Sequence, residues 1–190
     1  MYRLKIIFAS VREGRKGISV AEWVKEVVSK DQRFETEFVD LKALNLPAMD
    51  EPHHPRLQKY EREHTKKWSA KISEADAFIF VTPEYDFGYP GVLRNALEYL
   101  FNEWQFKAAG IVSYGGVSAG TRSANALKGD LASLKVPALT EMVNIPMFTQ
   151  FIKEEGKLHP NEVMVKSLDT MLNELARWTK GMMVIRENKV

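Results

Sequence analysis

Strand-like and helix-like segments alternate along the whole chain, and this alternation limits the fold more than any other feature of the sequence. The first apolar run, residues 4–9, is followed by a stripe with helical spacing. That stripe consists of Val20, Trp23, Val24, Val27 and Val28. Spacing of i, i+3, i+4, i+7 and i+8 places these side chains on one helix face, as packing against a sheet requires.

Five strands and five helices are expected in all, which predicts a doubly wound α/β sandwich. The strands are expected at residues 4–9, 34–41, 77–81, 108–113 and 138–145. The helices are expected after residue 17 and at about 56–73, 92–104, 121–134 and 161–180. Crossovers between parallel strands are right-handed, so few topologies remain. We predict a parallel sheet of order 2-1-3-4-5 with helices on both faces, a flavodoxin-like three-layer sandwich, because the glycine fingerprint of a dinucleotide-binding half is missing.

We expect one domain over residues 1–190, without internal repeats. The Pro-containing segment 42–55 is predicted as loop, and residues 150–160 as a small hairpin or a surface excursion.

Composition excludes several classes of function. The net charge of +2 gives no reason to expect nucleic-acid binding. The absence of cysteine removes disulfides, thiolate catalysis and cysteine-ligated metals. The first apolar run is too short for a secretory signal, and no stretch approaches the length of a membrane span. A cytoplasmic enzyme or binding protein is therefore expected.

The loop after the third strand is the strongest candidate for a ligand site. It runs from Thr82 to Gly91 and carries Tyr85, Phe87 and Tyr89. Ligands of open parallel sheets bind beyond the carboxyl ends of the strands. We interpret this loop as holding a flavin, whose flat ring the aromatic side chains would cover. The alternative is aromatic packing at a strand end, with an ordinary Pro-Gly turn.

Two further loops lie at carboxyl ends of strands. Residues 10–17 precede a helix, whose N-terminal amides and dipole favour an anion such as phosphate. Residues 113–122 contain three glycines, which permit close approach of backbone to a ligand. Alternatively, the first is a solvated basic turn with Ser10 as a local cap, and the second is a flexible connection capped by Ser118 or Thr121.

Three motifs make the chain similar to a known family. They are Ala9-Ser10-Val11-Arg12, the run from Pro83 to Ala96 that begins Pro-Glu-Tyr-Asp, and Ser113-Tyr114-Gly115-Gly116 followed by Ala119-Gly120. Over about residues 3–145 the chain resembles the NAD(P)H-dependent FMN reductases, which include quinone- and azo-compound-reducing members. Ala9 and Asp86 stand where that family usually has glycine and asparagine. An ionised carboxylate only accepts hydrogen bonds, so Asp86 is expected to face solvent or Arg94.

The resemblance implies a cofactor site for FMN, with NADPH or NADH as co-substrate. Phosphate contacts are implied for Ser10, Arg12, Arg15, Lys16 and Gly17. Contacts along the ribityl chain and the ring are implied for Pro83, Glu84, Tyr85, Asp86 and Phe87. The glycine-rich loop, Ser113, Tyr114, Gly115 and Gly116, would meet the ring.

The resemblance also implies ping-pong reduction of a small-molecule acceptor such as a quinone, a free flavin or an azo compound. No catalytic side chain is expected, because the cofactor carries the chemistry. No metal site is expected either, since His53, His54, His64 and His159 lack ligand spacing. The alternatives are a non-enzymatic flavin or nucleotide sensor and a one-electron carrier.

A homodimer or a dimer of dimers is implied as well. Residues 48–55 are expected to close over the neighbouring subunit's flavin. Tyr89, Tyr99 and Trp104 are candidates for the subunit interface, although core packing explains them equally well.

Overall fold

One parallel sheet forms the centre of the computed structural model, which describes residues 1–153 and 155–188. Its strand order is β2-β1-β3-β4-β5, which confirms the predicted topology. The strands are β1 (Tyr2–Phe8), β2 (Phe34–Asp40), β3 (Ala77–Pro83), β4 (Ala108–Tyr114) and β5 (Val143–Ile145). All four neighbouring pairs are parallel, so the carboxyl ends of the strands share one edge of the sheet.

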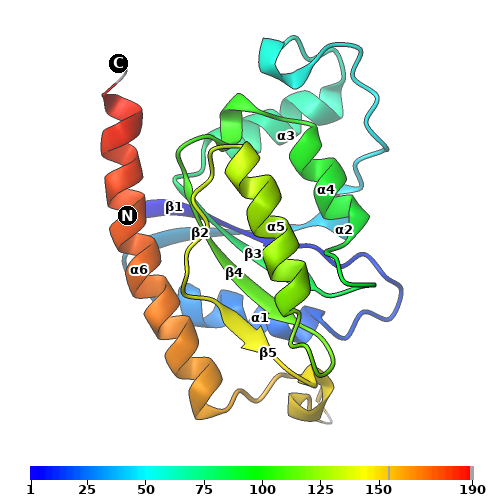
Figure 1. Cartoon of the computed structure of the whole chain (residues 1–190), viewed down its shortest axis with the longest axis vertical. Coiled ribbons are helices and arrows are strands. Elements are labelled where there is room, and N and C mark those ends of the chain that lie inside the picture. Colours follow the sequence, from blue (N-terminus) through cyan, green and yellow to red (C-terminus); the bar gives the residue numbers. More distant parts are fainter. Residues whose placement is uncertain (154, 189–190) are drawn as a thin grey trace.

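Helices cover both faces of this sheet, giving three layers (Figure 1). One face packs against α1 (Ile18–Val28) and α6 (Glu162–Glu187). The other packs against α3 (Glu63–Ser73), α4 (Gly91–Glu98) and α5 (Thr121–Ser133). The remaining helical pieces are short: α2 (Leu41–Leu44) and the 3-10 turns Pro55–Leu57, Asn102–Trp104 and Phe148–Phe151.

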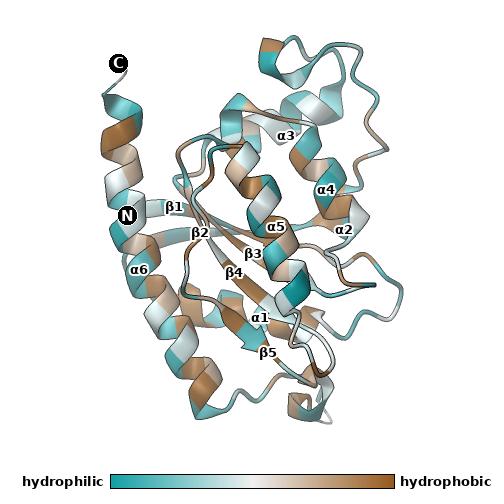
Figure 2. Cartoon of the chain, viewed as in Figure 1, coloured by the Kyte–Doolittle hydropathy of each residue, from teal (hydrophilic) through white to brown (hydrophobic). Residues whose placement is uncertain are grey.

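The central strand β3 shows how the sequence divides the core in two. Every residue from Ala77 to Pro83 is buried. Ile79 and Val81 join the cluster under α1 and α6, whereas Phe78 and Phe80 join the cluster under α3, α4 and α5. Alternation of side chains along a strand produces this division. Figure 2 shows the same continuous hydrophobic colour along the central strands.

The helix before β3 begins at Glu63 rather than near residue 56, contrary to the prediction. Glu51 explains the late start, because its carboxylate accepts hydrogen bonds from the backbone amides of Glu61 and Arg62, each at 2.9 Å. These bonds hold the preceding chain in an extended course. Side-chain acceptors compete with helix formation in this way.

The helix after β3 ends at Glu98 instead of continuing to residue 104. Two buried indoles cap its C-terminal end. Trp68 Nε1 donates a hydrogen bond to the carbonyl of Ala96 at 2.9 Å, and Trp104 Nε1 donates one to the carbonyl of Leu97 at 3.2 Å. Tyr99 and Trp104 are completely buried. Core packing therefore accounts for these two aromatic residues, which were also candidates for a subunit interface.

The last strand and the last helix also differ in length from the prediction. Strand β5 is confined to Val143–Ile145, and Ala138 forms only an isolated bridge to Ala109. Helix α6 extends to Glu187, and Arg186 ties its final turn to the loop before β4, donating to the carbonyl of Phe106 at 2.8 Å.

The segment predicted as a hairpin or surface excursion contains one antiparallel bridge, between Ile152 and Leu158. Glu154, within it, lies outside the described residues. Of the helices described, none combines the length and the hydrophobicity that crossing a membrane demands.

Candidate functional site

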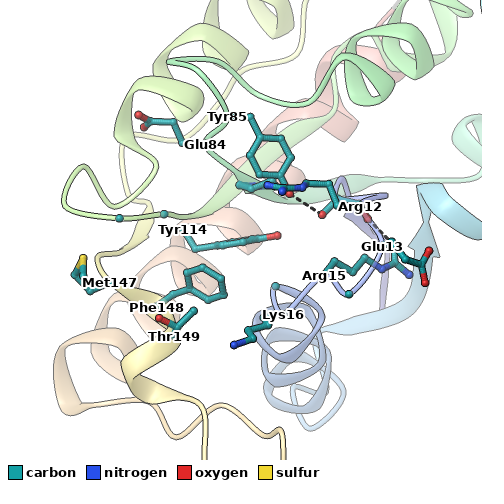
Figure 3. Close-up of a pocket in the computed structure, with 16 residues that line it drawn as sticks. Arg12, Glu13, Arg15, Lys16, Glu84, Tyr85, Tyr114, Met147, Phe148 and Thr149 are labelled. Atoms are coloured by element: carbon teal, nitrogen blue, oxygen red, sulfur yellow. Dashed lines mark hydrogen bonds between the residues drawn. The ribbon is translucent and has the colours of Figure 1, made fainter.

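A cavity of about 480 Å³ opens at the carboxyl edge of the sheet (Figure 3). Four loop segments line it: residues 10 and 12–17 after β1, 83–85 after β3, 114–116 after β4 and 147–149 after β5. Volumes of 300–1,000 Å³ are usual for small-molecule sites. All three loops that the sequence singled out thus meet in one cavity, together with a fourth that it did not.

Two cations of the first loop have unpaired charged groups. Arg12 and Lys16 are exposed, and their side chains form no hydrogen bond or ion pair with the residues described. Arg12 lies over the Tyr85 ring, 5.1 Å from its centre. Helix α1 begins beside them, and no side chain caps its first turn. This end of the cavity combines free positive charge with the positive end of a helix, as an anion site does.

Arg15 belongs to the same loop but is already engaged. Its guanidinium forms an ion pair with Asp40 at the end of β2, donates to the carbonyl of Ser10 and lies over the Phe8 ring at 4.9 Å. Burial alone would raise the pKa of Asp40, but hydrogen bonds from Arg15 and from the amide of Lys42 outweigh it and lower that pKa. Arg15 therefore shapes the loop, although it also lines the cavity.

Three hydroxyl groups lie on the inner side of the cavity. Ser10 Oγ and Tyr85 Oη are 3.0 Å apart and hydrogen-bonded. Tyr114 Oη is buried and forms no hydrogen bond of regular geometry with any described residue, although Ser10 is near it. Burial raises the pKa of Tyr114, so its hydroxyl remains a protonated donor without an acceptor. An unused buried donor is costly in a folded protein and indicates a missing ligand atom.

Gly17 makes room for this tyrosine. A Cβ atom at position 17 would lie 2.0 Å from Tyr114 Oη, which no real contact allows. The ring of Tyr114 packs on Phe148 from the fourth loop, with centres 4.8 Å apart. Tyr114 therefore joins the first, third and fourth loops across the cavity (Figure 3).

Glu84 turns its carboxylate away from Tyr114 and Phe148 (Figure 3). Arg122 in the first turn of α5 binds it, with Nε 2.5 Å from Oε1 and its amide 3.2 Å from Oε2. The backbone amide of Glu84 donates to the carbonyl of Tyr114 at 3.1 Å, linking the second and third loops.

Three residues that the resemblance implied do not line the cavity. Ser113 is buried and donates to the carbonyl of Ala119 at 2.9 Å, while 2.8 Å separates its Oγ from Asn144 Oδ1. Asp86 and Phe87 are exposed in a tight turn. Arg94 forms ion pairs with Glu98 and Asp130, and the exposed Asp86 faces solvent rather than Arg94.

Five cavity residues were missed by the sequence: Glu13, Gly14, Met147, Phe148 and Thr149. The last three follow β5, and their position beyond the carboxyl end of a fifth strand is the signal that could have found them. Tyr89 lies outside the cavity, half-buried and hydrogen-bonded to Asp130. No group of three metal-ligating side chains gathers in the part of the chain described.

Comparison with known proteins gives a family and several relatives. Residues 2–150 match the family described as NADPH-dependent FMN reductase. An NAD(P)H-dependent FMN reductase of Schizosaccharomyces pombe is 42% identical over 146 residues, which are 73% of this chain and 72% of that protein. A 2-hydroxy-1,4-benzoquinone reductase of a Burkholderia species is 26% identical over 94% of this chain and 96% of its own.

A similar fold occurs among solved structures. A flavoenzyme NAD(P)H:(acceptor) oxidoreductase from Paracoccus denitrificans superposes with a TM-score of 0.78 at 20% identity. The superposition covers 96% of this chain and 99% of that one, so the two share the fold over nearly their whole length.

Proposed function

Because the chain belongs to the NADPH-dependent FMN reductase family, we propose that the cavity at the carboxyl edge of its sheet binds FMN. The family that the motifs indicated is confirmed, and the protein is an oxidoreductase that uses FMN and NAD(P)H. One observation carries the assignment of the cavity: unpaired cations stand at one end, and glycines with an aromatic ring at the other.

The cationic end suits the phosphate of FMN. Arg12 and Lys16 supply positive charge that no protein carboxylate neutralises among the described residues. Ser10 supplies a hydroxyl, and Gly17 places the positive end of α1 at the cavity wall. Charge-assisted hydrogen bonds to phosphate oxygens are each worth roughly 1.5–3 kcal/mol, so these groups hold most of the binding free energy at this end.

The opposite end suits the flat ring. Pro83, Glu84 and Tyr85 line this part of the cavity. The backbone amides of Glu84 and Tyr85 are already used within the protein, so the segment offers a wall of fixed shape rather than free donors. Gly115 and Gly116 permit close approach of backbone. The ring of Tyr114, packed on Phe148, lines the cavity, whereas its hydroxyl points toward Gly17 at the cationic end (Figure 3).

The other implied site residues have structural roles. Arg15 lines the cavity but is already paired, and Ser113, Asp86 and Phe87 lie outside the cavity. Arg15 holds the first loop to Asp40. Ser113 holds the end of β4 beside β5 through Asn144. Asp86 and Phe87 continue the loop of Tyr85 beyond the cavity.

When bound, FMN supplies the chemistry that accepts a hydride from NAD(P)H and returns two electrons to an acceptor. The protein binds and orients, and it contributes no general acid or base. Reductant and acceptor use the same side of the site in turn, which makes the kinetics ping-pong. Double-reciprocal plots at several acceptor concentrations would then be parallel, and intersecting lines would contradict this order.

Quinones, free flavin and azo compounds are the proposed acceptors, and the Burkholderia relative named as a benzoquinone reductase supports the first of these. The enzyme works in the cytoplasm as a homodimer or a dimer of dimers. Cell fractionation and sedimentation test these two statements.

The decisive experiment is an absorbance spectrum of the purified protein reconstituted with FMN, recorded before and after anaerobic NADPH. Flavin bands that bleach within seconds and return with a quinone are expected. A protein that does not retain FMN would contradict the cavity assignment. A protein that retains FMN and resists NADPH would instead be a sensor or an electron carrier.

A further inference from the structure

The turn that follows Tyr85 has an unusual backbone. Tyr85 and Gly88 exchange two backbone hydrogen bonds, each of 2.9 Å, which closes a two-residue hairpin. Its central residues, Asp86 and Phe87, have φ angles of 47° and 70°. Such turns favour Asn-Gly, because both central residues adopt the left-handed region. Phenylalanine has no intrinsic preference for this conformation, so the surroundings must impose it.

Arg122 contacts the turn through a cation–π interaction. Its guanidinium lies over the Phe87 ring, 3.9 Å from the ring centre. The same side chain is anchored by Glu84, whose carboxylate is almost completely buried. The chain of contacts from Glu84 through Arg122 to Phe87 therefore fixes the ring relative to the cavity wall, since Glu84 itself lines the cavity.

The Phe87 ring is exposed to solvent although Arg122 fixes its position. Phe87 is 69% exposed. Two other large apolar side chains are exposed on the loops that follow β4 and β5. Val117 is 89% exposed and follows Gly116, which lines the cavity, and Met147 is 42% exposed and lines the cavity itself. Single exposed apolar residues are ordinary, but here three of four converging loops each present one. We call Phe87, Val117 and Met147 the apolar rim.

Met147, the rim residue that lines the cavity, lies away from Lys16. Figure 3 shows Met147 and Glu84 on the side opposite to Glu13 and Lys16, and Glu84 is joined through Arg122 to Phe87. That is the end assigned above to the flat ring of FMN. A molecule that exchanges electrons with this ring must reach it there, so it would meet the rim.

We infer that Phe87 is a specificity-determining residue for the flat second substrate, a quinone or the nicotinamide of NAD(P)H, and that Arg122 is the positioning residue that presents it. This inference rests on the proposed FMN site. Arg122 occupies one face of the ring, which leaves the other face for stacking. Aromatic pairs gain free energy beyond the area they bury, and a ring already held in place loses little entropy on binding.

Acceptor binding to the oxidised FMN-loaded enzyme tests the inference directly, without NADPH and therefore without turnover. The probe is 1,4-naphthoquinone, followed by quenching of tryptophan fluorescence. Phe87→Ala should weaken its binding about three- to tenfold, as the loss of one aromatic stack predicts. Phe87→Trp should restore it, because an indole stacks as well as a phenyl ring.

Steady-state kinetics provide the second readout. Phe87→Ala should raise KM for 1,4-naphthoquinone by the same factor and change kcat less than about twofold, because the ring takes part in binding alone. KM for ferricyanide, an octahedral complex that cannot stack, should not change. Arg122→Gln should reproduce this pattern, and Arg177→Gln, an exposed arginine of α6, serves as its control.

Several outcomes would overturn the inference. Equal naphthoquinone affinity in Phe87→Ala and wild type would exclude a role of the ring. Equal losses for both acceptors would mean that the turn acts on the site as a whole. A changed sedimentation coefficient would assign Phe87 to a contact between two copies of the chain. FMN affinity, measured by quenching of flavin fluorescence, separates the two proposals: if wild type does not bind FMN the proposed function fails, whereas weaker FMN binding in Phe87→Ala alone assigns the turn to the cofactor.

Discussion

The two edges of the sheet differ in how completely their polar and charged groups are paired within the protein. At the amino edge, Asp76 accepts hydrogen bonds from the amide of Arg3 at 2.9 Å and from Arg186 at 3.1 Å. Lys107 donates to the carbonyls of Ile72 and Ser73 at the end of α3. Every one of these groups is paired within the chain.

At the carboxyl edge, Arg12 and Lys16 lack partners among the described residues, and Tyr114 has an unused hydroxyl. The strained turn at Asp86 and Phe87 is also there. The difference teaches that the polar groups named at the amino edge serve folding, while the carboxyl edge has, besides pairs such as Arg15 with Asp40, unpaired groups that a ligand can use. Changes at the two edges should therefore separate stability from cofactor binding.

The largest effect on stability is expected at the amino edge. Asp76→Ala leaves Arg186 and the amide of Arg3 without their acceptor, so the free energy of unfolding should fall by about 3–5 kcal/mol. Urea denaturation measures it, with FMN affinity expected to be unchanged. Asp169→Ala, on the exposed side of α6, is the control and should cost less than about 0.5 kcal/mol. Loss of FMN affinity in a folded Asp76→Ala protein would contradict the separation of stability at the amino edge from cofactor binding at the carboxyl edge.

Arg12→Ala makes the opposite change. Removing a cation without protein partners should weaken FMN binding by about 1.5–3 kcal/mol, or roughly ten- to hundredfold, because charge-assisted bonds to phosphate are lost. Quenching of flavin fluorescence measures the affinity. The free energy of unfolding without FMN should stay within about 0.5 kcal/mol of wild type. An unchanged FMN affinity would contradict the assignment of the phosphate to this loop.

Gly17→Ala should affect both properties, since it touches a packing contact within the ligand edge. The new Cβ would collide with Tyr114 Oη, so overpacking should cost about 1–3 kcal/mol of stability and weaken FMN binding as well. Gly129→Ala in α5 is the matched control. A Cβ there has no neighbour within 4 Å, and alanine should stabilise the helix by up to about 1 kcal/mol.

Lys107 gives the smallest and most easily graded effect, through pH. Burial lowers the pKa of Lys107 from 10.5 to about 7. Between these values the unfolded chain binds the proton and the folded chain does not, so this lysine makes stability rise with pH from about 7 to 9. The rise should amount to about 2 kcal/mol. Lys107→Gln should lack this contribution in urea denaturation at pH 7 and pH 9, and identical pH dependence in both proteins would refute it.

Local patterns explain why much of the fold could be predicted. The stripe of α1 and the apolar run of β3 are patterns that neighbouring residues define, and they located these elements. The correct strand order followed from the alternation of strands and helices together with the missing glycine fingerprint. Boundaries failed where distant side chains intervened. Glu51 delays the start of α3, and the indoles of Trp68 and Trp104 cap α4. Such contacts have no counterpart in a local repeat.

By itself, the sequence determined the order of the elements, the family and the three loops that meet at one edge of the sheet. Only the tertiary structure decided which groups remain free there. Arg15 and Arg12 look alike in the sequence, yet Asp40 engages the first and no described residue pairs with the second. Glu84 and Arg122 likewise meet only after folding. Side chains find partners through space rather than along the chain, and the balance of paired and unpaired groups creates the site.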